Sequence, residues 1–107
     1  MSWRVAVVGM MVMAACFGCD AEGADEADAI LALTGDATAG EALYQTHCSA
    51  CHGADARSGS AQKDLPDEDA HELVHVMLEG EGFAMPSFRE TLTDQEIADI
   101  AAYLATL

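Results

Sequence analysis

Three segments between positions 36 and 107 carry apolar residues at the three- and four-residue intervals typical of amphipathic helices. The first segment follows Asp36, which is suited to cap a helix N-terminus. One face of this segment would present Gly40, Leu43, Tyr44 and His47. The pattern therefore predicts a helix that runs from Asp36 toward Cys48.

The second segment is bounded by start and stop signals. Pro66 or Asp67 opens it with a cluster of acidic residues that suits the positive end of a helix, and Gly80 ends it. Its apolar face would comprise Leu73, Val74, Met77 and Leu78.

The third segment begins with Thr93 and Glu96, which form the T-x-x-E pattern of a capping box. Its apolar face would comprise Ile97, Ile100, Ala101 and Leu104, with Asp94, Glu96 and Asp99 facing outward. No extended run alternates with the period of two that strands require. The sequence therefore predicts an all-α domain with about three main helices.

The motif Cys48-Ser49-Ala50-Cys51-His52 follows the first predicted helix and has the C-x-x-C-H form of a c-type haem attachment signal. Its two thiols, Cys48 and Cys51, would add across the vinyl groups of one haem, and the imidazole of His52 would bind the iron. A thioredoxin-like use of C-x-x-C would need a βαβ context. A disulfide within either cysteine pair of the chain is a competing possibility in an oxidising compartment.

A second iron ligand is expected at Met85. This residue lies in an irregular segment between the second and third predicted helices, where Pro86 restricts the backbone beside it. Two alternatives to Met85 as the second iron ligand remain. Met77 is one, although it lies on a helix face and fits the core better. His71 or His75, which stand four residues apart, would instead give ligation by two histidines. A histidine–methionine pair would fill both axial positions and raise the reduction potential relative to two histidines.

The first 19 residues are typical of an export signal, with Arg4 before an apolar run from Val5 to Ala15 that is too short to span a bilayer. Cys16 and Cys19 each follow small residues and resemble the lipid-attachment cysteine of bacterial lipoproteins. We favour Cys19, because Gly18 precedes it and an acidic stretch follows. An ordinary cleaved signal or an uncleaved anchor is the alternative reading.

Residues 20–35 are expected to form a flexible linker between the signal and the domain of residues 36–107. Asp20 to Ala29 is acidic, rich in small residues and too poor in apolar surface to fold alone. A domain this short has a marginal core, which a large apolar haem would complete. We therefore expect the chain without haem to be largely unfolded.

The charge of the chain is strongly acidic, with a formal net charge of −15. All 19 acidic residues follow Cys19, against only Arg57, Lys63 and Arg89. This balance argues against nucleic acid and anionic membrane surfaces as direct partners. It favours redox partners with a basic docking patch, although simple solubility or adaptation to salt would explain it equally well.

Together these motifs resemble the class I cytochrome c family in its short bacterial form. The likeness rests on Gly40, Tyr44, the C-x-x-C-H motif and the sequence Met85-Pro86-Ser87-Phe88, and covers about two thirds of the chain. It implies that the terminal helices cross at Gly40 against Ile100 and Tyr103, with Leu104 turned toward the haem. It also implies that Leu65 packs on haem and that the carbonyl of Lys63, where the family has Pro, holds the imidazole.

The function that the sequence predicts is electron transfer rather than catalysis. An exported, membrane-tethered carrier on the periplasmic side of a bacterial membrane would cycle one haem iron between Fe(III) and Fe(II). Such a carrier has redox proteins as partners and no small-molecule substrate. The alternatives are a gas- or peroxide-reactive haem sensor or enzyme with a labile sixth ligand, and a thiol or binding protein in which C-x-x-C-H is accidental.

Overall fold

The computed structural model describes residues 22–107, with side chains from residue 26 onward. The signal and lipid-attachment predictions for residues 1–19, including Cys16 and Cys19, therefore lie outside the described residues. None of the described helices is long and apolar enough to cross a membrane.

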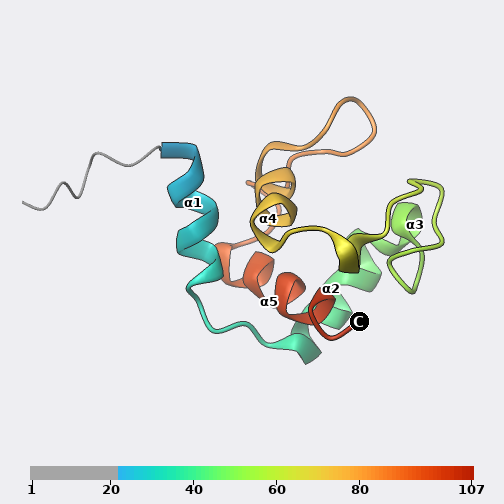
Figure 1. Cartoon of the computed structure of the whole chain (residues 1–107), viewed down its shortest axis with the longest axis horizontal. Helices are drawn as coiled ribbons and strands as arrows, with labels where there is room; N and C mark the ends of the chain where they lie inside the picture. The colour runs from blue at the N-terminus through green and yellow to red at the C-terminus, as the bar shows by residue number, and fades with distance from the viewer. Residues whose placement is uncertain (1–21) are drawn as a thin grey trace, which may run out of the picture.

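The described part of the chain is all-α, as predicted (Figure 1). Its helices are α1 (Glu22–Leu31), α2 (Ala37–His47), α3 (Ser49–His52), a 3₁₀ turn (Leu65–Asp67), α4 (Ala70–Glu79) and α5 (Asp94–Leu104). The three expected helices correspond to α2, α4 and α5. Within residues 22–107, β pairing is limited to one isolated bridge between Glu81 and Met85.

The helix ends follow from their capping residues. Asp36 accepts hydrogen bonds from the backbone amides of Thr38 and Ala39, and the predicted capping box of Thr93 and Glu96 is present at the start of α5. The predicted start of α4 was wrong by a few residues. Pro66 lies instead in the 3₁₀ turn, and α4 begins after Asp69, whose carboxylate accepts from the amide of Glu72.

The core forms around α5, which packs against α1, α2 and α4, and α2 and α5 make the most extensive helix–helix contact. Buried apolar residues of both α4 and α5 belong to this one core cluster. Gly40 makes the contact between α2 and α5 possible, because a Cβ built there would lie 1.8 Å from the carbonyl oxygen of Asp99. The predicted close crossing at Gly40 is confirmed.

Asp99 was expected to face outward, and this expectation was wrong. Its side chain is buried and accepts hydrogen bonds from the backbone amide of Asp36 (2.8 Å) and from Nε2 of Gln95 (2.9 Å). The carboxylate thus joins the start of α2 to the middle of α5. A buried polar group of this kind is tolerated because it has partners.

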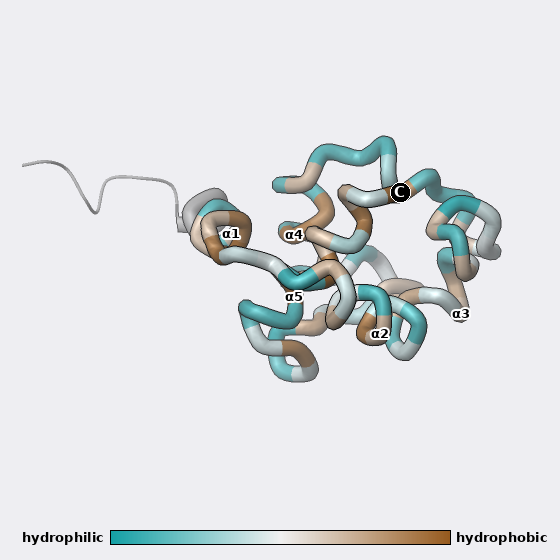
Figure 2. Tube along the Cα trace, turned by 90° about the horizontal axis from the view of Figure 1, so that it is seen from below, coloured by the Kyte–Doolittle hydropathy of each residue, from teal (hydrophilic) through white to brown (hydrophobic). Residues whose placement is uncertain are grey.

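The prediction of a flexible linker was also wrong for residues 22–31, which form α1. This helix packs against α4 and α5 at the end of the described region opposite α3 (Figure 1 and Figure 2). Ala27 and Ile30 are fully buried in the core, and Leu31 packs against it. These three residues form an apolar stripe at positions i, i+3 and i+4, which supplies the burial that the acidic stretch alone lacks.

Candidate functional site

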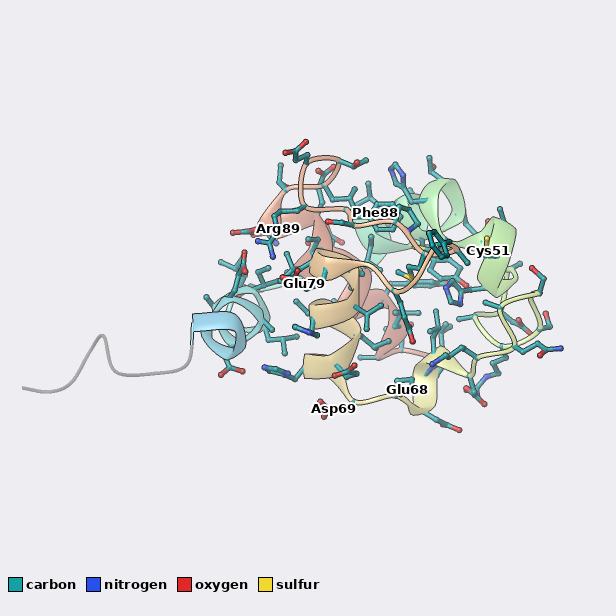
Figure 3. All side chains as sticks on the ribbon, turned by 90° about the horizontal axis from the view of Figure 1, so that it is seen from above. Cys51, Glu68, Asp69, Glu79, Phe88 and Arg89 are labelled. Atoms are coloured by element: carbon teal, nitrogen blue, oxygen red, sulfur yellow. The ribbon has the colours of Figure 1, made fainter. Side chains whose placement is uncertain are left out.

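One cavity of about 510 Å³ brings together the residues that the sequence singled out. Cys48, Cys51, His52 and Met85 all line it. The rest of its wall is mainly apolar and includes Leu65, Leu73, Val76, Met77, Ile100 and Leu104. Figure 3 labels two of the lining residues: Cys51, on α3, and Phe88, after the loop that follows α4. Size and lining suit a large apolar group with few polar attachments.

The C-x-x-C-H motif forms a tight turn of its own. α2 ends at His47, the amide of Cys48 donates to the carbonyl of Tyr44 (2.8 Å), and the amide of His52 donates to the carbonyl of Cys48 (3.0 Å). This single helical turn places both thiols and the imidazole on one cavity. Both cysteines are free thiols, so the alternative disulfide is not formed between Cys48 and Cys51, whereas Cys16 and Cys19 lie outside the described residues. Burial raises the pKa of the Cys48 thiol to about 11, whereas Cys51 is exposed.

The loop of residues 53–64 folds back on this motif and holds it. The amide of Gly59 donates to the carbonyl of His52 (3.2 Å), and that of Ala61 donates to Cys51 (2.8 Å). A Cβ on Gly59 would lie 2.2 Å from the carbonyl oxygen of Cys51, so only glycine fits there. The sequence pattern did not predict this supporting role. The turn residues Gly53 and Gly59 were its only sequence signal.

Asp55 shapes the same loop. Its Oδ1 accepts from the backbone amides of Arg57 (3.0 Å) and Ser58 (2.9 Å) and from the Ser58 hydroxyl (2.8 Å). These hydrogen bonds favour the ionised carboxylate and lower the pKa of Asp55. Tyr44 closes the loop from the other side, because its hydroxyl donates to the carbonyl of Gly53 (2.6 Å).

The expected hydrogen bond between His52 and the Lys63 carbonyl is not made. Nδ1 of His52 is buried and has no hydrogen-bond partner. Desolvation lowers the pKa of His52, and the nearby positive charge of Lys63 lowers it further. The neighbouring Gln62 has a φ of 56°, which redirects the backbone just before Lys63. The turn and the loop behind it therefore hold the backbone of His52, while its ring nitrogen Nδ1 has no acceptor.

Met85 lies in a narrow loop that returns to the end of α4. The amide of Glu81 donates to the carbonyl of Met85 (2.9 Å), and the amide of Met85 donates back to Glu81 (3.2 Å). Phe83 at the tip is fully exposed, and a Cβ on Gly82 would meet nothing within 4 Å. Met85 is thus held at the base of the loop, partly buried against the core.

The competing ligands are placed less favourably. His71 and His75 do not line the cavity, and Nε2 of His71 lies 3.6 Å from the carboxylate of Asp28 on α1. Met77 does line the cavity, but its side chain is buried in the core from α4, as predicted. From residue 22 onward, no group of three or more histidine, cysteine or acidic residues could hold a metal ion by itself.

Comparison with known proteins identifies a family and several relatives of this chain. Residues 35–104 match the family described as cytochrome c oxidase, cbb3-type, subunit III. The chain is 36% identical to a cytochrome c-553-like protein of Synechocystis sp. over 81 residues, which cover 73% of this chain and 75% of that protein. It is 33% identical to cytochrome c6 of Gloeothece citriformis, over 68% of this chain and 73% of that protein.

A third relative is larger. The cbb3-type cytochrome c oxidase subunit FixP of Sinorhizobium medicae is 30% identical over 65% of this chain, which corresponds to 29% of that protein. No solved structure gives a significant match.

The chain therefore belongs to the cytochrome c family. It is a c-type cytochrome with one covalent haem c, and it is an electron carrier rather than an enzyme. As an electron carrier it exchanges electrons with redox partner proteins.

Proposed function

We propose that Cys48 and Cys51 hold the haem through thioether bonds and that His52 and Met85 are its two axial ligands. The observation that carries this proposal is the single cavity onto which all four residues open, although Met85 comes from a different loop. Bound there, haem c supplies an iron that accepts one electron to become Fe(II) and releases it to return to Fe(III).

The residues around the cavity keep the two ligands in place during this exchange. The loop of residues 53–64 supports the turn that carries His52, and the bridge between Glu81 and Met85 closes the methionine loop. The apolar wall from α4 and α5 would exclude water from the bound haem, which would lower the reorganisation energy of electron transfer. As a soft, neutral ligand, the thioether of Met85 would favour Fe(II) and would leave no open position on the iron for a substrate.

A Met85→Ala variant tests the ligand assignment. We expect haem to remain attached, the iron to become high-spin or water-ligated, and the reduction potential to fall. Met77→Leu is the matched control, because Met77 lines the same cavity but belongs to the core. The visible spectra of both oxidised proteins, including the weak red-edge band of sulfur–iron(III) bonding, provide the measurement.

An unchanged spectrum in Met85→Ala would remove Met85 from the site. Immediate carbon monoxide binding by the reduced wild-type protein would point the same way, toward a labile sixth ligand. His52→Ala should prevent stable holoprotein from forming, because the remaining thioethers would attach haem without a ligand from the motif.

The proposal extends to location and docking. A lipid on Cys19, or alternatively Cys16, would tether the domain to the periplasmic side of a bacterial membrane. Membrane fractionation of Cys19→Ser and Cys16→Ser separates the two sites, because only loss of the lipidated cysteine releases the protein. If both variants remain in the membrane fraction, the lipid tether is wrong.

A partner with a basic docking patch is supported by the net charge of −15 and by Glu68, Glu72 and Glu81 at the cavity. The rate of electron exchange with a basic redox protein should therefore fall as ionic strength rises. A rate that does not depend on salt would contradict this part of the proposal.

A further inference from the structure

α1 meets the rest of the molecule at the segment that leaves the Met85 loop. Arg89, four positions after Met85, pairs with Glu26 of α1 and with Glu79 at the end of α4 (2.5 Å to Glu79). Figure 3 shows Arg89 and Glu79 beside each other, on the side that faces α1. One guanidinium therefore joins three elements: α1, α4 and the exit of the methionine loop.

The backbone next to Arg89 is tied to α4 as well. The amide of Arg89 donates to Oγ of Ser87 (3.3 Å), and that hydroxyl donates to the carbonyl of Leu78 (2.5 Å). The amide of Phe88 donates to the carbonyl of Met77 (2.8 Å). Only two residues, both held against α4, therefore separate Arg89 from Pro86, which follows Met85 directly.

The docking of α1 is built into the core and is more than a surface ion pair. Ala27 is 0% exposed and Ile30 is 1% exposed, and both belong to the same apolar cluster as α4 and α5. Gln95 of α5 also donates through Nε2 to the carbonyl of Thr34, just after α1 (2.8 Å). The match to the cytochrome family begins at residue 35, so α1 lies outside it.

We infer that α1 is a brace for the methionine loop and that Arg89 is a positioning residue for Met85. The inference rests on the proposed ligation by Met85. An exposed ion pair contributes little to global stability, but this one fixes the point where the loop rejoins the fold. Without Arg89, Glu26 and Glu79 would face each other unpaired, and their repulsion would favour separation of α1 from the loop exit.

The test measures how often Met85 leaves the iron. Imidazole binds the oxidised holoprotein only after the methionine dissociates, so its limiting binding rate reports that opening. We expect Arg89→Gln to raise this rate about fivefold, the equivalent of about 1 kcal/mol. Glu26→Gln should raise it less, because Arg89 retains Glu79 as a partner.

Arg57→Gln is the matched control. Arg57 is as exposed as Arg89 (42% against 41%), but it forms a single ion pair, with Asp64 at 2.6 Å, where Arg89 forms two, and it lies in the loop that supports the C-x-x-C-H motif. Its imidazole rate should equal that of the wild type. Thermal denaturation of each variant, followed by far-ultraviolet circular dichroism, measures global stability in parallel. It separates opening of the methionine loop from a loss of stability of the whole fold.

Two results would overturn the inference while leaving Met85 as the ligand. One is an unchanged imidazole rate in Arg89→Gln, and the other is an equal rise in Arg57→Gln. A wild-type protein that lacks the sulfur–iron band instead refutes the ligand proposal, and the inference fails with it. The two failures are thereby distinguished.

Discussion

The two loops that border the cavity are held in different ways. The loop of residues 53–64, the motif side, is fixed by backbone hydrogen bonds to Cys51 and His52 and by a glycine with no room for a side chain. The loop of residues 81–85, the methionine side, is closed by a single bridge between its two ends and carries the exposed Phe83 at its tip.

This difference corresponds to the strength of the bonds that each loop serves. The motif side would carry two covalent thioethers and the stronger imidazole ligand, so a rigid support does not have to adjust. The methionine side would carry the weaker thioether ligand, whose bond depends on how well the loop positions it. The comparison indicates a carrier whose cavity has one fixed wall, the motif side (residues 53–64), and one adjustable wall, the methionine side (residues 81–85).

The largest effect is expected from a substitution in the loop of residues 53–64, the motif side. Gly59→Ala places a Cβ 2.2 Å from the carbonyl oxygen of Cys51, and we expect a loss of about 3 kcal/mol in the free energy of unfolding. Gly82→Ala should cost only about 1 kcal/mol, because its Cβ meets open space and only its φ of 61° opposes the substitution. Guanidinium denaturation of the two holoproteins measures both. Equal losses would mean that the two walls are equally constrained.

The next effect concerns Tyr44, which supports the fixed wall through Gly53. Burial raises its pKa from 10 to about 12, so the unfolded chain loses the proton first as pH rises. Wild-type stability should therefore fall by about 1.4 kcal/mol per pH unit from pH 10 to about 12 and be fully present below pH 10.

Tyr44→Phe should remove that slope and cost about 1 kcal/mol at neutral pH through the lost hydrogen bond to Gly53. Tyr103→Phe is the control, since the rings of Tyr103 and Tyr44 are neighbours at 5.5 Å. Denaturation followed by circular dichroism at several pH values gives both results. A slope that survives in Tyr44→Phe would show that another group is responsible.

The smallest effect compares one charge on each wall. Lys63 lines the cavity on the motif side and Glu81 lines it on the methionine side. Lys63→Gln removes a positive charge that favours Fe(II) and should lower the reduction potential, whereas Glu81→Gln should raise it. Each shift should correspond to about 1 kcal/mol or less in screened surroundings. Potentiometric titration measures the shifts, and two shifts of the same sign would contradict this charge assignment.

The sequence predicted the features that residue type encodes locally. The capping residues Asp36 and Thr93, the stop at Gly80 and the C-x-x-C-H motif all have short-range signatures, and the fold confirmed the helices they delimit. The close packing at Gly40 was predicted from family resemblance, because glycine at a helix crossing is recognisable only when the partner helix is known.

The missed features depend on contacts between distant residues. α1 was overlooked because its apolar stripe crosses the boundary at Ala29 and is stabilised mainly by α4 and α5. Asp99 was placed outside because only the folded start of α2 supplies its amide donor. The support from the loop around Gly59 comes from backbone hydrogen bonds, which have no side-chain signature beyond the glycines that the turn requires.

Heating the oxidised holoprotein while following two signals tests the central claim most directly. The sulfur–iron band reports Met85, and far-ultraviolet circular dichroism reports the helices. The account predicts that the band is present in the folded protein and disappears at a lower temperature than the helical signal, because the methionine wall yields first. A missing band, or loss of both signals at the same temperature, would contradict it.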